Sequence, residues 1–449
     1  MILTPVALIA CSSSPSSPGE EPAGLAAEAL HGTANNGQRS FDEALPHTNG
    51  RACATCHVEN THRALVPAEV ESRFQADPAD PIFNRLDADD PDAANPTYAH
   101  LRQKGLIRVT IHIADNLDVV DEAGNVITNA DRTVSVWRGV PTIENTALTA
   151  PYQSDGREAT LQDQALGALR AHSAISHDPP GAILDHIADF EKSVFSSPGV
   201  AAVADALADG QPPADPDPPF APGSDEAAGK ALFQTACTPC HGGPSGDQIV
   251  NRAAAQPIFV GFNDDGSIQT ITLPDGTVVP KPQPDHPDDR FLNIGIAFGA
   301  YLRQIPPAQG GIPDPTALPL PHLRLRFYTD ATRTQARFDL PPPLPLLGPN
   351  ATPQAFSVDP GRALISGDPV DFEAFDVPQL RGIAGTAPYF HDNSRPTLRS
   401  VVDLYSRFIL PFIPAIGLPP VVPPAGPGLP PESLTVTQKV QLVAYLNKI

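Results

Sequence analysis

Four of the five cysteines form two C-x-x-C pairs, and a histidine follows each pair directly. Two thiols at this spacing add to the two vinyl groups of one haem, and the adjacent histidine then ligates its iron. A zinc half-site or a redox dithiol also uses C-x-x-C, but only Cys11 is left to complete a zinc site. We therefore expect two covalently bound haem c groups, at Cys53, Cys56 and His57 and at Cys237, Cys240 and His241.

A pattern that precedes each haem motif indicates two domains. G-x-x-x-F occurs as Gly37 to Phe41 and again as Gly229 to Phe233. Around the second copy, Ser224 or Asp225 is suited to cap a helix. The apolar face of this predicted helix is Ala228, Leu232, Phe233 and Ala236.

Each half also closes with an amphipathic pattern. A helix before the haem motif and a helix at the end are the plan of a class I cytochrome c domain. We predict a mainly α protein with two class I cytochrome c-like haem domains, at 37–210 and 224–449, joined by a Pro-rich linker at 211–223. The closing helices are expected to bury Ile183, Ile187, Phe190 and Val194 in the first half, and Val436, Val440, Val443 and Leu446 in the second.

The composition agrees with a folded acidic protein that is rich in loops. Its 449 residues include 55 prolines and carry a formal net charge of −22. Such a charge excludes nucleic acid as a natural partner and favours long-range attraction of a cationic one. The stretches 313–321 and 340–349 are typical of long polyproline-like loops, and we expect the acidic block 87–92 to be solvated.

The first residues resemble an export signal. Residues 1–11 are apolar and end in Leu-Ile-Ala-Cys, similar to a bacterial lipobox, so we expect lipidation of Cys11 and a flexible tether at 12–36. No basic residue precedes Arg39, which suggests that the true start lies upstream. A free cysteine in a disordered tail is the alternative. No stretch of 18 apolar residues exists, so the prediction is a periplasmic protein that touches the outer membrane only through a lipid anchor.

Two longer segments make the chain similar to the bacterial dihaem cytochrome c peroxidase and MauG superfamily. They are RGVPTIENTALTAPYQSDGREATLQDQALGAL at 138–169 and FDVPQLRGIAGTAPYFHDNSRPTLRSVVDLY at 375–405. The terminal LVAYLNK adds to the likeness, which covers residues 36–449. The resemblance implies that His57 is the proximal ligand of the haem where peroxide reacts, and His241 that of the electron-transferring haem.

The same resemblance assigns further ligands. Tyr405 aligns with the distal ligand of the second haem, which is Met in the peroxidases and Tyr in MauG, and the only methionine here is Met1. A tyrosine in the helix core is the alternative. The family also binds one Ca²⁺, partly through backbone carbonyls of a T-x-P segment. Thr386 and Pro388 fit this segment, and an ordinary turn is the alternative.

One departure concerns the proton chemistry of the first haem. The family has a glutamate that acts as acid and base, and Gln162 stands at that position. An amide forms hydrogen bonds but exchanges no proton near neutral pH. Asp163 is the weaker candidate to replace it, because adjacent helical positions point about 100° apart.

Other side chains are assigned by neither motif nor spacing. His62, His100 and His112 follow the first haem motif, and each is a candidate to occupy the sixth position of that iron; a five-coordinate iron is the alternative. His391 is a candidate for contact with a haem propionate. Trp137, the single tryptophan, is expected to be buried packing rather than an electron relay.

Three functions remain open. The first is a peroxidase-type or MauG-type oxidoreductase that passes electrons from a small periplasmic cytochrome or copper protein to H₂O₂ or another substrate. The second is an electron-transfer protein without efficient peroxide chemistry, which Gln162 favours. The third is an oxygenase that resembles the dihaem rubber oxygenases. We prefer the first.

Overall fold

The computed structural model describes residues 36–241, 270–272, 278–280, 290–304, 317–337, 356–410 and 432–449. Cys11, residues 313–316 and the stretch 340–349 lie outside these ranges, so the expectations about them stay predictions. None of the helices described reaches the length and hydrophobicity that a membrane span requires.

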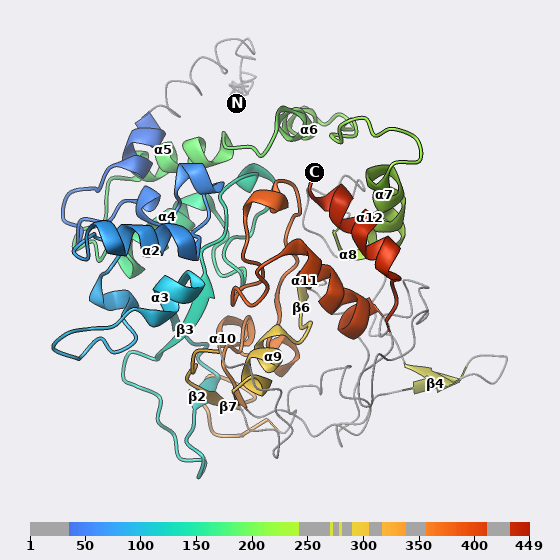
Figure 1. Cartoon of the computed structure of the whole chain (residues 1–449). Coiled ribbons are helices and arrows are strands. Elements are labelled where there is room, and N and C mark those ends of the chain that lie inside the picture. Colours follow the sequence, from blue (N-terminus) through green and yellow to red (C-terminus); the bar gives the residue numbers. More distant parts are fainter. Residues whose placement is uncertain are drawn as a thin grey trace, which may run out of the picture.

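The described chain is mainly helical, as predicted (Figure 1). A helical segment at 36–42 comes first, and the short 3-10 turns η1 (Cys53–Thr55) and η4 (Thr146–Leu148) lie in the first half. The remaining helices of the first half are α2 (Pro67–Ala76), α3 (Ala99–Lys104), α4 (Leu161–Ala171), α5 (Gly181–Lys192) and α6 (Pro198–Ala208). Those of the second half are α7 (Asp225–Ala236), α8 (Thr238–His241), α9 (Ile296–Leu302), α10 (Ala363–Ser366), α11 (Leu398–Leu404) and α12 (Val436–Leu446).

Small antiparallel sheets, which the sequence did not lead us to expect, accompany the helices. One of them joins the two halves, because a first-half strand, β2, pairs with β7 of the second half. The pairs are β1 (Leu106–His112) with β3 (Thr133–Gly139), β2 (Leu117–Val119) with β7 (Leu323–Phe327), β7 with β8 (Phe356–Ser357), β4 (Thr270–Thr272) with β5 (Val278–Pro280), and β6 (Phe291–Leu292) with β9 (Phe375–Asp376).

Each G-x-x-x-F pattern marks a close crossing of two helices. A Cβ atom on Gly37 would lie 1.8 Å from the carbonyl oxygen of His186 in α5. A Cβ atom on Gly229 would lie 2.0 Å from the carbonyl oxygen of Gln441 in α12. Glycine is therefore required at both crossings, and the phenylalanine four residues later is fully buried in each. In Figure 1, α7 and α12 lie against each other.

The predicted face is correct for α5 and correct in part for α12, where Leu446 is buried and Val443 packs against the core. Ile187 and Phe190 of α5 are buried, and Ser224 caps α7 by accepting a hydrogen bond from the amide of Ala227. In α12, Val436 is 69% exposed and Val440 is 46% exposed. The crossing at Gly229 turns inward a face that shares only Leu446 and Val443 with the predicted one. An ion pair with Glu432 allows even a lysine to be buried there. The buried residues are Lys439, Leu442, Tyr445 and Leu446.

The expectation of a solvated acidic block is wrong at its first residue. The Asp87 side chain is buried and accepts a hydrogen bond of 2.6 Å from Arg51, which is also buried. Arg51 additionally donates to the carbonyl oxygens of Pro81 and Ile82. The pair tethers the acidic segment to the residues that precede the first haem motif.

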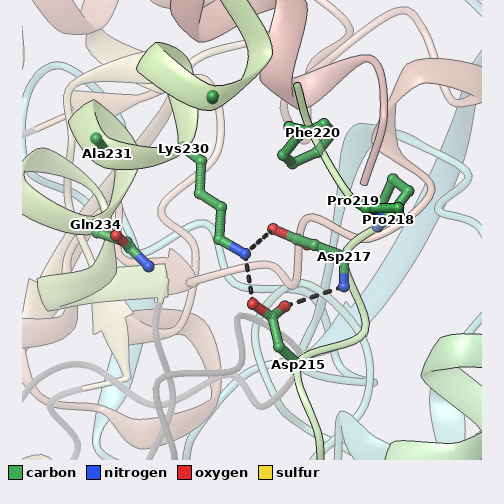
Figure 2. Close-up of a pocket in the computed structure, with 9 residues that line it drawn as sticks. Asp215, Asp217, Pro218, Pro219, Phe220, Lys230, Ala231 and Gln234 are labelled. Carbon is green, nitrogen blue, oxygen red and sulfur yellow. Dashed lines mark hydrogen bonds and ion pairs between the residues drawn. The ribbon is translucent and has the colours of Figure 1, made fainter. Parts of the chain in front are cut away.

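The linker is held tightly to the second half. Lys230 of α7 lies 2.5 Å from Asp215 and 2.7 Å from Asp217, and Figure 2 shows it between the two carboxylates at the edge of a surface pocket. Asp217 is also paired with Arg381 and accepts a hydrogen bond of 3.0 Å from the Tyr445 hydroxyl. These contacts fix how the chain enters α7.

A buried arginine joins the two halves. Arg138, at the end of β3, is 3% exposed and donates to Asp155 of the first half over 2.5 Å. It also forms a two-point pair with Asp359 of the second half, over 2.7 and 2.9 Å. Both carboxylates are buried. Arg138 is the ion-pair partner of Asp359, whereas Asp155 is also paired with Arg157 over 2.9 Å.

We predict that Arg138→Met destabilises the protein by about 3–5 kcal/mol, because it removes the counter-charge of the buried Asp359 and leaves the buried Asp155 with Arg157 alone. Chemical denaturation of the haem-loaded protein measures the loss. Arg170→Met is the matched control, since Arg170 and Asp178 form an exposed pair whose loss costs at most ~1 kcal/mol. Equal effects of the two substitutions would contradict the assigned role of Arg138.

Candidate haem sites

The first haem motif presents its histidine in the form that binds iron. Cys53 and Cys56 are free thiols in and just after η1. Nδ1 of His57 lies 2.9 Å from the carbonyl oxygen of Arg63. A carbonyl only accepts, so Nδ1 carries the proton and Nε2 keeps its lone pair. Burial lowers the pKa of His57 to about 4, so the imidazole is neutral at pH 7.

The second motif repeats this arrangement with a distant acceptor. His241 ends α8 and is 8% exposed. Its Nδ1 lies 2.9 Å from the carbonyl oxygen of Pro378, and burial lowers its pKa. Cys237 and Cys240 are free thiols here as well. Both motifs thus have two thiols and a neutral imidazole of fixed tautomer, a set that fits covalent haem c.

Tyr405 lies near His241. Their ring centroids are 6.5 Å apart, with an angle of 57° between the ring planes. The phenol thus lies beside the second haem motif, where the family resemblance assigns it as a ligand. Tyr405 also begins a π-helical turn, Tyr405–Ile409, an irregularity that is frequent at functional sites. Burial raises the pKa of the phenol, so a bound cation is needed to stabilise the phenolate.

The segments that precede α4 and α11 are structural copies of each other. The Tyr152 hydroxyl donates to the carbonyl oxygen of Thr146 over 3.1 Å, and the Tyr389 hydroxyl donates to that of Ile383 over the same distance. Each tyrosine also forms an isolated β-bridge with the residue six positions later. The sequence carries a signal for this repeat, because Val-Pro is followed at equal spacing by Thr-Ala-Pro-Tyr in both halves, but it was not among the predictions above.

This repeat identifies the first-half equivalent of Tyr405. A threonine caps each following helix, Thr160 for α4 and Thr397 for α11. Counted from these caps, Ala168 takes the position of Tyr405. Alanine has no atom that can ligate iron, so the two halves differ at the position where the family resemblance predicts a haem ligand in the second half.

Gln162 and Asp163 both lie in the first turn of α4. The Gln162 amide donates to Asp185 of α5 over 3.1 Å. Asp163 is exposed and accepts a hydrogen bond of 2.7 Å from the Thr160 hydroxyl, which also accepts from the Asp163 amide. The carboxylate of Asp163 is therefore engaged in capping the helix.

The other histidines have varied surroundings. His62 pairs with Glu144 over 3.2 Å, and His112 is exposed on β1. His100 lies 2.6 Å from Asp89, and its ring stacks on Trp137, which is 7% exposed. His391 stacks on Phe375 with ring centroids 3.6 Å apart.

The T-x-P segment lies directly after η8 (Ile383–Gly385). The Thr386 hydroxyl donates to the carbonyl oxygen of Ile383 over 3.1 Å, and Pro388 precedes Tyr389. Within the described ranges, no group of three or more His, Cys, Asp or Glu side chains gathers as a metal site. Ligation of Ca²⁺ by backbone carbonyls stays a prediction.

Glu191 is a buried acidic residue that the sequence did not lead us to single out. It lies near the end of α5 and is 2% exposed. Burial raises its pKa to about 8. Its carboxyl group contributes to the raised pKa of the Cys53 thiol, so it lies within electrostatic reach of the first haem motif. Comparing the two closing helices would have found it, because the corresponding residue of α12 is Leu446.

Comparison with known proteins gives one match in sequence and several in structure. No family model matches the chain. The cytochrome-c peroxidase IdrP2 of Denitromonas iodatirespirans is 34% identical over 93 residues, which are 20% of this chain and 21% of that protein. The aligned part thus spans about a fifth of this relative's length.

Three solved structures are similar over most of the chain. A MauG-like protein associated with microbial copper homeostasis has a TM-score of 0.40 at 18% identity, covering 93% of this chain and 88% of its own. Hydrazine synthase of Kuenenia stuttgartiensis has a TM-score of 0.39 at 13% sequence identity, and the match covers 99% of this chain and 98% of that one. The dihaem peroxidase BthA of Burkholderia thailandensis has a TM-score of 0.39 at 15% sequence identity, and the match covers 93% of this chain and 85% of that one. All three likenesses are weak.

Glu191 makes folding stability fall as pH rises. The folded chain keeps this proton up to about pH 8, whereas the unfolded chain releases it near 4.5, the ordinary pKa of a glutamic acid. Unfolding therefore releases a proton between these values, so alkaline conditions favour the unfolded state. We predict that Glu191→Leu, which copies Leu446, stabilises the protein in its fully reduced state by roughly 3 kcal/mol at pH 7 and by much less at about pH 5. Denaturation at both pH values measures this, and a pH-independent difference would contradict it.

Proposed function

We propose that the chain is a member of the bacterial dihaem cytochrome c peroxidase and MauG superfamily, and a two-haem oxidoreductase that reduces peroxide or oxidises a substrate; the 34% identity to a cytochrome-c peroxidase over 93 residues supports this. Each half, 37–210 and 224–449, is proposed to be a class I cytochrome c-like domain with its own haem. The helix crossing before each motif and the fixed histidine tautomers support this division.

The contrast between Tyr405 and Ala168 carries the proposal. Haem iron supplies one-electron chemistry and, where a coordination position is open, a place for peroxide or dioxygen. His241 and Tyr405 are proposed to be the two residues that would hold the iron in the second half, which would leave that site to electron transfer. In the first half His57 holds one position, and Ala168 leaves space where the other half has a phenol. Electrons are thus proposed to enter at the second half and to be used in the first.

Proton handling favours the MauG-type form over an efficient peroxidase. Gln162 exchanges no proton near pH 7, and its amide is bonded to Asp185. Asp163 is engaged in capping α4. This same feature favours the second candidate, an electron-transfer protein without efficient peroxide chemistry. The dihaem oxygenase remains a third candidate, since an open position also suits dioxygen.

We further propose the protein's partner and location. The net charge of −22 suits a small cationic cytochrome or copper protein as electron donor. Covalent haem attachment and the lipobox-like Cys11 support a periplasmic protein anchored to the outer membrane. A Ca²⁺ ion held by the carbonyls of Thr386 and Pro388 is proposed on the family resemblance alone.

Rapid-mixing absorption spectroscopy with stoichiometric H₂O₂ tests the function. We expect the spectrum of the first haem to change quickly in the fully oxidised protein, as in a MauG-type enzyme. Reaction only after half-reduction would indicate a gated peroxidase instead. No reaction in either state, with two haems bound per chain, would contradict the proposal and favour electron transfer or dioxygen chemistry.

A substitution at Ala168 ties this reaction to the open position. Ala168→Tyr copies Tyr405 and is expected to slow the peroxide reaction and cyanide binding at the first haem by at least about tenfold, a barrier increase of about 1.4 kcal/mol. Ala171→Tyr, at the exposed end of the same helix, is the matched control and should leave both unchanged. Unchanged cyanide binding in Ala168→Tyr, with two haems still bound, would show that Ala168 does not face the iron.

A further inference from the structure

Glu191 is a buried acid in the core of the first half that has no assigned role. Its side chain is 2% exposed, and its Oε2 atom has no hydrogen-bond partner in the described part of the chain. Its backbone carbonyl accepts a hydrogen bond of 2.9 Å from the Thr146 hydroxyl, which fixes this turn of α5 against η4. A buried carboxyl without a partner is costly in its ionised form, so it binds a proton unless a nearby positive charge stabilises the carboxylate.

The surroundings of Glu191 contain two titratable groups that interact with it. Its charge raises the pKa values of the Cys53 thiol and the Tyr152 phenol. Among the described residues no positive side chain offsets its burial, and burial is the cause of its raised pKa. Four charged side chains lie on the elements around it: Asp42, Arg63, Arg290 and Asp163. Arg63 lies over the rings of Phe41 and Phe190, and Arg290 lies near Tyr152. Asp163 is the residue that takes part in capping α4.

The second half has an apolar residue, Leu446, at the position that corresponds to Glu191. Phe190 packs at the Gly37 crossing as Tyr445 packs at the Gly229 crossing, so the next residues, Glu191 and Leu446, are equivalent. Leu446 is 6% exposed. The raised pKa of Cys237 accordingly has burial and Cys240 as its causes and no carboxyl. The acid is thus specific to the haem site of the first half.

We propose that Glu191 takes up a proton when the first haem is reduced and releases it when that haem is oxidised. This inference rests on the proposed function in requiring a haem attached at Cys53 and Cys56. One electron from the donor converts ferric to ferrous iron, and one proton from solvent converts the Glu191 carboxylate to the carboxylic acid. The reverse step returns both.

The direction of this coupling follows from electrostatics in a poorly solvated core. Ferric iron carries one more positive charge than ferrous iron and therefore stabilises the carboxylate. In the haem-free chain burial raises the pKa of Glu191 to about 8. The positive charge of ferric iron lowers this pKa, and reduction to ferrous iron raises it again. Between these two values, each electron that enters the first half is accompanied by a proton.

Spectroelectrochemical titration of the two-haem protein at several pH values tests the coupling. We expect the reduction potential of the first haem to fall as pH rises between ~6 and ~8, by at most about 59 mV per tenfold change in proton activity. Glu191→Gln should remove most of this slope, and Glu191→Leu should do the same. Asp189→Asn, which removes a carboxyl from the same helix, should keep it.

Infrared difference spectra give an independent readout. On reduction of the first haem, the carbonyl band of a protonated carboxylic acid should appear, and it should be missing in Glu191→Gln. A flat potential in the unmodified protein, or a slope and band that persist in Glu191→Gln, would overturn the inference. The haem content measured beforehand separates the two proposals, because a chain with no haem at Cys53 and Cys56 fails the proposed function itself.

Discussion

The hydrogen bond from a histidine Nδ1 to a backbone carbonyl is the interaction on which each haem site depends. It fixes the tautomer and ring orientation, and so decides which nitrogen is free for iron. For His57 the acceptor is Arg63, six residues away. For His241 it is Pro378, 137 residues away. The first site is thus completed locally, whereas the second requires its half to fold before the imidazole is oriented.

The two halves use one scaffold and differ where the chemistry differs. Both cross two helices at a glycine, and both place the same Thr-Ala-Pro-Tyr turn before the next helix. At equivalent positions, however, Tyr405 corresponds to Ala168 and Leu446 corresponds to Glu191. The first half therefore has a small side chain and a buried acid, while the second has a phenol near His241 and an apolar residue in place of the acid. This division is consistent with proton-linked chemistry in one half and electron transfer in the other.

The sequence was most informative where chemistry or packing restricts the residue type. The C-x-x-C-H motifs, the glycines at the crossings and the cap at Ser224 could all be predicted, because few residues satisfy those geometries. The face of α12 could be predicted only in part, since Val436 and Val440 are exposed. Lys439 is buried on that helix because Glu432 and Asp403 pair with it. Arg138 and Glu191 were missed for a similar reason, as their burial depends on residues distant in sequence.

Electron paramagnetic resonance of the fully oxidised two-haem protein tests most directly the claim that the two iron sites differ. We expect one low-spin signal from the His241 and Tyr405 site and one high-spin signal from the His57 site. Tyr405→Phe should abolish the low-spin signal and leave the high-spin one. Two low-spin signals, or a low-spin signal that survives Tyr405→Phe unchanged, would contradict the account.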